Sequence, residues 1–140
     1  METQSSQSAH EGHAPLPAAT EQIARSIVDA ALAVHRTLGP GLLETAYELC
    51  LVHEFERRGH TVAQQVLLPV IYDSVKLDAG YRIDLMVDDK VVVEVKAVDA
   101  LIPIHEAQLL TYLRLSGRRL GLLINFNVQL MKHGIKRRIL

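Results

Sequence analysis

The sequence predicts a single α/β domain whose central mixed sheet of four strands is flanked by helices. Two observations lead to this prediction. The chain has 140 residues, 49% hydrophobic and 22% charged, which suits one domain with a sizeable core. Segments with apolar residues at helical spacing also alternate with short β-branched runs that end in turn residues. The expected order of elements is α-α-β-β-β-α-β.

Residues 1–19 are rich in Ser, Gln, Ala, Pro and His, with too few large apolar side chains to offset the entropy of ordering. We therefore expect a flexible tail at residues 1–19 before a single domain at residues 20–140. Thr20 is a candidate N-cap for the first helix. The apolar stripe of that helix consists of Ile23, Ile27, Ala31, Val34 and Leu38.

The sequence GPG at residues 39–41 ends the first helix, and a second helix is expected from Leu42 to Arg58 with Gly59 as its C-cap. Four strands and a third helix follow. The strands are expected at 65–72, 81–87, 91–98 and 119–127, and the helix from about Ile104 to Ser116, between the last two of them.

Several classes of protein are disfavoured by composition. Cys50 is the only cysteine, which excludes an internal disulfide and an iron–sulfur cluster held by four cysteines of this chain. No run of 18 apolar residues, no secretory signal and no glycine-rich nucleotide-binding loop occurs in the sequence. We therefore expect a cytoplasmic protein with no membrane association and no nucleotide cofactor.

Two charges interrupt an apolar strand at residues 90–98, KVVVEVKAV. Side chains alternate along a strand, so Glu94 and Lys96 share one face. If the preceding hairpin loop has three residues, Asp84 lies opposite Glu94. A two-residue loop would instead place Asp84 opposite Val93.

Two adjacent carboxylates repel each other unless a cation neutralises them or one is protonated. Hard oxygen ligands suit Mg²⁺ or Mn²⁺, and Lys96 could orient a water molecule or stabilise charge on a phosphate oxygen. This chemistry is that of phosphodiester hydrolysis. The alternative is a buried salt bridge between Glu94 and Lys96, with Asp84 at a strand end.

An aspartate on one strand, here Asp84, followed by the EVK of residues 94–96 on the next, resembles the core of the PD-(D/E)xK nuclease superfamily. The first half of that motif reads YRID here, at residues 81–84. The stretch GPGLLETAY contains Gly41, Glu44 and Tyr47 in the pattern G-x-x-E-x-x-Y and is similar to the GxxExxY family of that superfamily. The resemblance extends over roughly residues 20–138 and implies a PD-(D/E)xK nuclease-like core.

The resemblance also implies roles for individual residues. Asp84, Glu94 and Lys96 would be catalytic. Both carboxylates would bind Mg²⁺ or Mn²⁺ together with Glu44. Substrate contacts would come from Gln108 and Tyr112, which match a Q-x-x-x-Y element, and from Tyr47, although either tyrosine could instead be a core aromatic.

The end of the chain is basic. Glu106 is the last acidic residue, and the later basic residues are Arg114, Arg118, Arg119, Lys132, Lys136, Arg137 and Arg138. They could attract phosphates, with Arg114 and Arg118 as substrate contacts, or simply pair with the acidic earlier part of the chain. We expect a metal-dependent nuclease acting on nucleic acid. The alternative is a silent module of the same fold that binds nucleic acid or protein, and a homodimer is expected from the resemblance alone.

Overall fold

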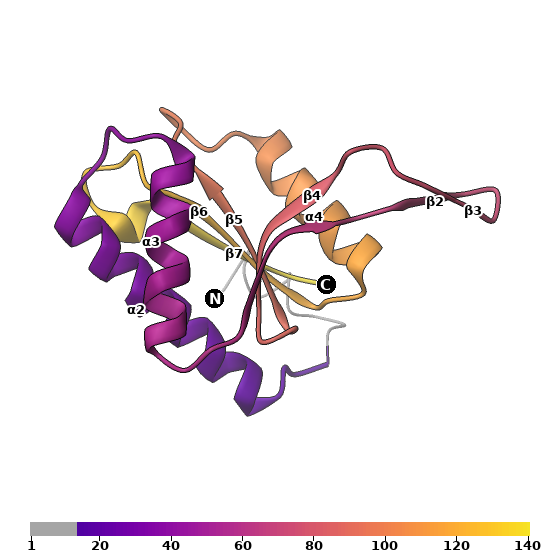
Figure 1. The fold of residues 1–140 in the computed structure, drawn as a ribbon, viewed down its shortest axis with the longest axis horizontal. Coiled ribbons are helices and arrows are strands. Elements are labelled where there is room, and N and C mark those ends of the chain that lie inside the picture. Colours follow the sequence, from indigo (N-terminus) through magenta and orange to yellow (C-terminus); the bar gives the residue numbers. More distant parts are fainter. Residues whose placement is uncertain (1–13) are drawn as a thin grey trace.

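The computed structural model describes residues 14–140, so most of the expected tail lies outside the described residues. The described chain forms a mixed five-stranded sheet with helices on both faces and a small separate hairpin (Figure 1). The helices are α2 (Ala18–Leu38), α3 (Glu44–Arg57), α4 (Pro103–Ser116) and the short 3₁₀ helix η1 (Met131–His133). The strands are β1 (Val62–Leu67), β2 (Val70–Tyr72), β3 (Val75–Leu77), β4 (Arg82–Val87), β5 (Val91–Lys96), β6 (Leu120–Asn125) and β7 (Ile135–Ile139).

The strand order of the large sheet is β1-β4-β5-β6-β7. Only β5 and β6 are parallel, and α4 connects them, as a parallel pair requires. Helices α2 and α3 cover one face and α4 covers the other (Figure 1). Alternate residues of β5 therefore enter two different cores. Val91, Val93 and Val95 pack with α2 and α3, and Val92 packs with α4.

The structure corrects the expected four-stranded sheet in two places. The segment 65–72 is not one strand, because Pro69 has no N–H for a ladder and separates β1 from β2. Strand β2 pairs only with β3, in a hairpin that extends away from the body (Figure 1). The C-terminal segment Ile135–Ile139 forms a fifth strand at the sheet edge, where its charged side chains are tolerated.

Two expected helix caps are also corrected. Helix α2 begins at Ala18, after Pro17, so Thr20 lies inside the helix and is buried rather than capping it. Arg58 is the C-cap of α3, and Gly59 follows it with a φ of 90°. The left-handed conformation explains the glycine at that position. None of the helices in residues 14–140 combines the length and the apolar character that crossing a membrane requires.

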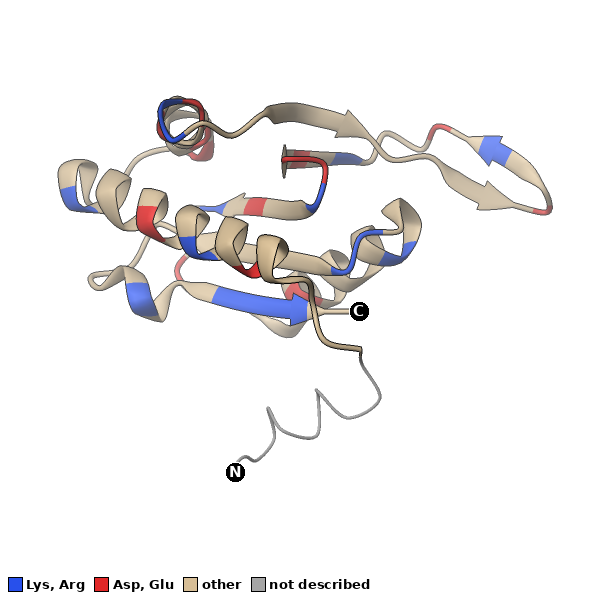
Figure 2. Cartoon of the chain, turned by 90° about the horizontal axis from the view of Figure 1, so that it is seen from below, with Lys and Arg blue, Asp and Glu red and all other residues tan. Residues whose placement is uncertain are grey.

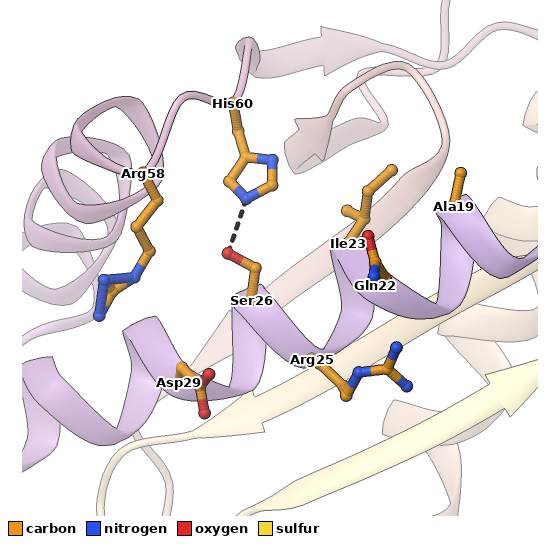
Figure 3. Close-up of a pocket in the computed structure, with 8 residues that line it drawn as sticks. All are labelled: Ala19, Gln22, Ile23, Arg25, Ser26, Asp29, Arg58 and His60. Carbon is orange, nitrogen blue, oxygen red and sulfur yellow. Dashed lines mark hydrogen bonds between the residues drawn. The ribbon is translucent and has the colours of Figure 1, made fainter.

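His60 ties α2 to the turn between β4 and β5. Its Nδ1 lies 2.6 Å from Asp88 Oδ2. Its Nε2 lies 2.7 Å from Ser26 Oγ, the contact drawn in Figure 3. A carboxylate, an imidazole and a hydroxyl also occur in this order in serine hydrolases, but those enzymes need donors for an oxyanion as well. Ser26 lies within α2, where neighbouring N–H groups serve the helix itself. We assign this array a structural role.

Gly134 approaches the end of β6 too closely for any side chain. Its carbonyl accepts the N–H of Asn125 at 2.8 Å, and an added Cβ would lie 2.2 Å from the Asn125 carbonyl oxygen. We expect Gly134→Ala to lower the free energy of unfolding by about 3 kcal/mol or more, because backbone must move. Urea unfolding followed by circular dichroism measures this change.

Gly121→Ala is the matched control for that prediction. A Cβ there would lie 2.7 Å from Cδ1 of Leu109, the far end of a side chain that can rotate. Its cost should be smaller, about 1–3 kcal/mol. Equal unfolding midpoints for Gly134→Ala and the unmodified protein would show that the turn after η1 adapts freely, contrary to this prediction.

Candidate active site

The backbone ladder between β4 and β5 stops at Asp84. The two strands pair regularly from the turn as far as Leu85 and Val93, in the register of a three-residue loop. Beyond that point, side chains replace backbone partners. The N–H of Asp84 donates to Glu94 Oε2 at 2.8 Å, and the N–H of Val95 donates to Asp84 Oδ2 at 2.9 Å. The three-residue alternative for the loop is therefore confirmed, and the two carboxylates lie side by side.

These two hydrogen bonds hold both carboxylates against the backbone of rigid strands. Each uses one oxygen, Asp84 Oδ2 or Glu94 Oε2, to accept a backbone N–H group. Glu94 is only 6% exposed. Burial, and next the charge of Asp84, raise the pKa of Glu94 to about 8, despite the opposing effects of the Asp84 N–H and of Lys96. Without a cation, Glu94 therefore holds a proton at neutral pH.

Lys96 completes this group from the end of β5. It lies two residues after Glu94, and its charge lowers the pKa of that carboxyl. The Lys96 carbonyl accepts the N–H of Phe126 at 2.9 Å. The buried Asn125 amide binds both backbone groups of Val98, which holds the loop after Lys96 in place. No ion pair joins Lys96 to Glu94 within residues 14–140, so the salt-bridge alternative does not describe this site.

A third carboxylate reaches the site from α3. The side-chain Nε2 of Gln65 donates to Glu48 Oε1 at 3.0 Å and lies 3.5 Å from Asp84 Oδ1. Burial and then Asp84 raise the pKa of Glu48, Gln65 lowers it, and Glu44 has the smallest effect. Glu48 is thus the α3 carboxylate beside Asp84. Glu44 lies one helical turn earlier. The i, i+4 spacing puts both glutamates on one face of α3, and this spacing is the feature of the sequence that could have pointed to Glu48.

Helix α4 brings tyrosine to the other side of the carboxylates. Burial, and then the charges of Glu94 and Asp84, raise the pKa of Tyr112, which places its hydroxyl in their field. The ring of Tyr81 lies 6.3 Å from that of Tyr112, and Tyr81 was not among the expected site residues. Gln108 is exposed one turn before Tyr112 on the same helical face.

Tyr47 lies in the protein interior instead. It is fully buried, and its ring stacks on Phe126 with centroids 4.4 Å apart. Its hydroxyl donates to the Gly39 carbonyl at 2.6 Å and accepts the N–H of Leu42 at 3.1 Å. These contacts hold the junction between α2 and α3, and they favour the core-aromatic alternative for this residue.

The structure does not bring all the expected basic residues to the site. Arg118 pairs with Asp89 in the turn before β5, whereas Lys96 ends that strand, roughly 16 Å beyond its first residue, Val91, at 3.3 Å per residue. Arg114 binds Thr111 on α4. Strand β7 carries a run of basic side chains (Figure 2), two of which pair with acidic side chains, namely Arg137 with Glu21 and Arg138 with Glu106.

The donor set fits a hard divalent cation. The carboxylates of Asp84, Glu94 and Glu48 offer oxygen atoms only, as Mg²⁺ and Mn²⁺ prefer. A cation would also replace the proton that burial keeps on Glu94. Among residues 14–140, no three His, Cys, Asp or Glu side chains already converge as a complete metal cage, so binding would require side chains to adjust.

Comparison with known proteins identifies the family. The model of the PD-(D/E)XK nuclease superfamily matches residues 21–138, and these nucleases usually use divalent metals such as Mg²⁺. Neither the curated proteins nor the solved structures provide a match to the chain. The matched segment includes the strands and helices that carry Asp84, Glu94 and Lys96, and the chain belongs to the PD-(D/E)XK nuclease superfamily.

Proposed function

We propose that this protein is a metal-dependent nuclease that hydrolyses phosphodiester bonds of nucleic acid. The observation that carries the proposal is a pair of hydrogen bonds across the broken ladder, from the Asp84 N–H to the Glu94 carboxylate and from the Val95 N–H to the Asp84 carboxylate. This pair holds two carboxylates against rigid strands, with Lys96 two residues after Glu94 on β5, so the backbone that carries the three groups is already in place and only side chains adjust when the cation binds.

In this proposal Asp84 and Glu94 hold Mg²⁺ or Mn²⁺, with Glu48 as the contribution of α3 in place of the expected Glu44. The ion would supply Lewis-acid chemistry when bound. Lys96 would hold the attacking water by a hydrogen bond and balance negative charge on the phosphate. Glu94 would release its proton as the ion enters, because a cation favours the ionised carboxylate.

We also propose membership of the GxxExxY family. The motif residues support it through the junction between α2 and α3, where Gly41 has a φ of 106° and the Tyr47 hydroxyl binds the chain on both sides. Such a junction orients α3, and so Glu48, toward the sheet. Nucleic acid would approach along α4, where Gln108 and Tyr112 flank the carboxylates. The homodimer stays a prediction, and light scattering would test it.

Asp84→Asn tests the proposed function directly. The asparagine oxygen can still accept the Val95 N–H, so the fold should survive while one negative ligand is lost. We expect Mn²⁺ affinity, measured by titration calorimetry, to fall at least about tenfold. Cleavage of labelled single- and double-stranded DNA and RNA should fall at least about a hundredfold.

Asp73→Asn, in the turn at the tip of the β2–β3 hairpin (Figure 1), is the matched control and should change neither quantity. Metal binding without cleavage of any of these substrates would favour the silent nuclease-fold module. Equal metal affinity in Asp84→Asn and the unmodified protein would contradict the proposed site.

A further inference from the structure

Gln65 adopts a backbone conformation that is unusual for a strand residue. Its φ is 50°, whereas antiparallel strands have φ near about −140°. The other non-glycine residues of the described chain with positive φ lie in the tight turns of the two hairpins, namely Asp73, Ser74, Asp88 and Asp89. A left-handed glutamine within a strand is strained, and such strain persists only where surrounding contacts enforce it.

The strained residue lies opposite Asp84. Strands β1 and β4 pair at Gln64 with Leu85 and at Val66 with Ile83, and the register omits the position between them. Asp84 therefore has an interrupted ladder on both sides. The carboxylate of Glu94 fills the interruption toward β5, and the side-chain amide of Gln65 fills the one toward β1.

The Gln65 amide occupies the space between two carboxylates from different elements. Its Nε2 lies 3.0 Å from Glu48 Oε1 and 3.5 Å from Asp84 Oδ1. Carboxylate oxygens only accept hydrogen bonds, so the amide must present its NH₂ group to them. This neutral donor reduces the repulsion between Glu48 and Asp84, and it stands where a cation shared by them would also be placed.

A side-chain amide has a second use in this position. A half-turn about its last bond replaces the NH₂ group by the carbonyl oxygen, and side-chain carbonyls are ligands of hard divalent cations. Gln65 is exposed, so neither tight packing nor a buried partner opposes that rotation.

We propose that Gln65 is a positioning residue of the metal site, and that its side-chain amide presents its NH₂ group in the metal-free protein and its carbonyl oxygen when the cation is bound. Its NH₂ group holds Glu48 and Asp84 together before the cation binds, and its carbonyl oxygen turns toward the cation afterwards. This inference rests on the proposed function and deepens it, because it assigns to β1 a part in metal binding that neither the EVK stretch nor the helix motif contains.

Titration calorimetry with Mn²⁺ tests the proposal through three variants. Gln65→Met keeps the length and the backbone strain but removes both polar ends, and its affinity should fall about tenfold. Gln65→Glu keeps an acceptor oxygen and should bind Mn²⁺ at least as tightly as the unmodified protein. In EDTA, however, its thermal midpoint should fall, because a third carboxylate then faces Glu48 and Asp84. Gln64→Met, the same change one residue earlier, should leave both measurements unchanged.

The outcomes separate this inference from the proposed function. Unchanged affinity in Gln65→Met, together with loss of binding in Asp84→Asn, would overturn the role of Gln65 and leave the metal site standing. An equal loss of Mn²⁺ affinity in Gln65→Met and Gln65→Glu would overturn the contribution of the carbonyl oxygen. In the proposed arrangement the glutamate keeps an acceptor oxygen for the cation, so its affinity should be retained. Failure of the unmodified protein to bind Mn²⁺ would overturn both proposals.

Discussion

Lys96→Met is expected to lower the rate of phosphodiester cleavage at least about a hundredfold while Mn²⁺ affinity stays within about threefold of the original. Lys96 offers a charged donor beside the carboxylates, and a preorganised donor aimed at developing charge typically contributes a factor of about 10²–10³ in rate. It is not a cation ligand, because it carries positive charge. Removing that charge near Glu94 should not weaken metal binding, because it removes a repulsion between Lys96 and the cation.

Single-turnover cleavage with saturating Mn²⁺, combined with calorimetry, separates these two effects. Lys90→Met is the control, since Lys90 is exposed in the turn before the same strand and lies at its opposite end. Cleavage by Lys96→Met at the original rate would remove the lysine from the proposed chemistry. Loss of metal binding in the same variant would instead make Lys96 part of the scaffold.

The second large effect concerns Glu94 and pH in the metal-free protein. The pKa of Glu94 is about 8 in the folded state, against an ordinary value of 4.5. Between these values the folded state holds a proton that the unfolded chain has released. The contribution to stability is therefore fully present below pH 4.5 and is lost as pH rises through about 8.

Glu94→Gln removes this dependence because the amide stays neutral and can still accept the Asp84 N–H. From pH 5.5 to 8.5 in EDTA, we expect the unmodified protein to lose about 3 kcal/mol of unfolding free energy more than the variant does. Urea unfolding at both pH values measures the difference. Added Mg²⁺ should restore stability at pH 8.5 in the unmodified protein only.

Glu56→Gln provides the matched control, because Glu56 is an exposed carboxylate on α3. It should follow the pH dependence of the unmodified protein. Identical pH dependence in Glu94→Gln and the unmodified protein would mean that Glu94 is already ionised at neutral pH, and the proposed exchange of a proton for a cation would then be wrong.

Local patterns in the sequence were sufficient to place Glu94 and Lys96 on one face and to make Asp84 a candidate neighbour of Glu94. The alternation of a strand places Glu94 and Lys96 on one face. Of the two loop lengths that the sequence allows, the structure has the three-residue one, which brings Asp84 beside Glu94. The helices were likewise recognisable from apolar spacing and glycine punctuation. These features depend on neighbours in the chain or on one hairpin, so a single sequence contains the necessary information.

Other features depend on contacts between distant elements. Strand β7 was missed because its run of basic residues resembles a solvated tail, and only its place at a sheet edge beside β6 makes it a strand. Arg118 was expected at the site but lies away from it. Strand β6 runs parallel to β5, so Arg118, just before the start of β6, lies near the start of β5 and far from Lys96 at its end.

The sequence by itself thus determined the α/β class and the family motifs, because those follow from short-range periodicity and spacing. The register that sets Asp84 beside Glu94 was one of two alternatives until the structure fixed the loop length. The tertiary structure alone decided that Glu48 rather than Glu44 lies beside Asp84, and that Gln65 bridges them. Both carboxylates share one face of α3, and the rotation and tilt of that helix on the sheet choose between them. Packing of Tyr47 on Phe126 sets that orientation, through a contact between residues far apart in the chain.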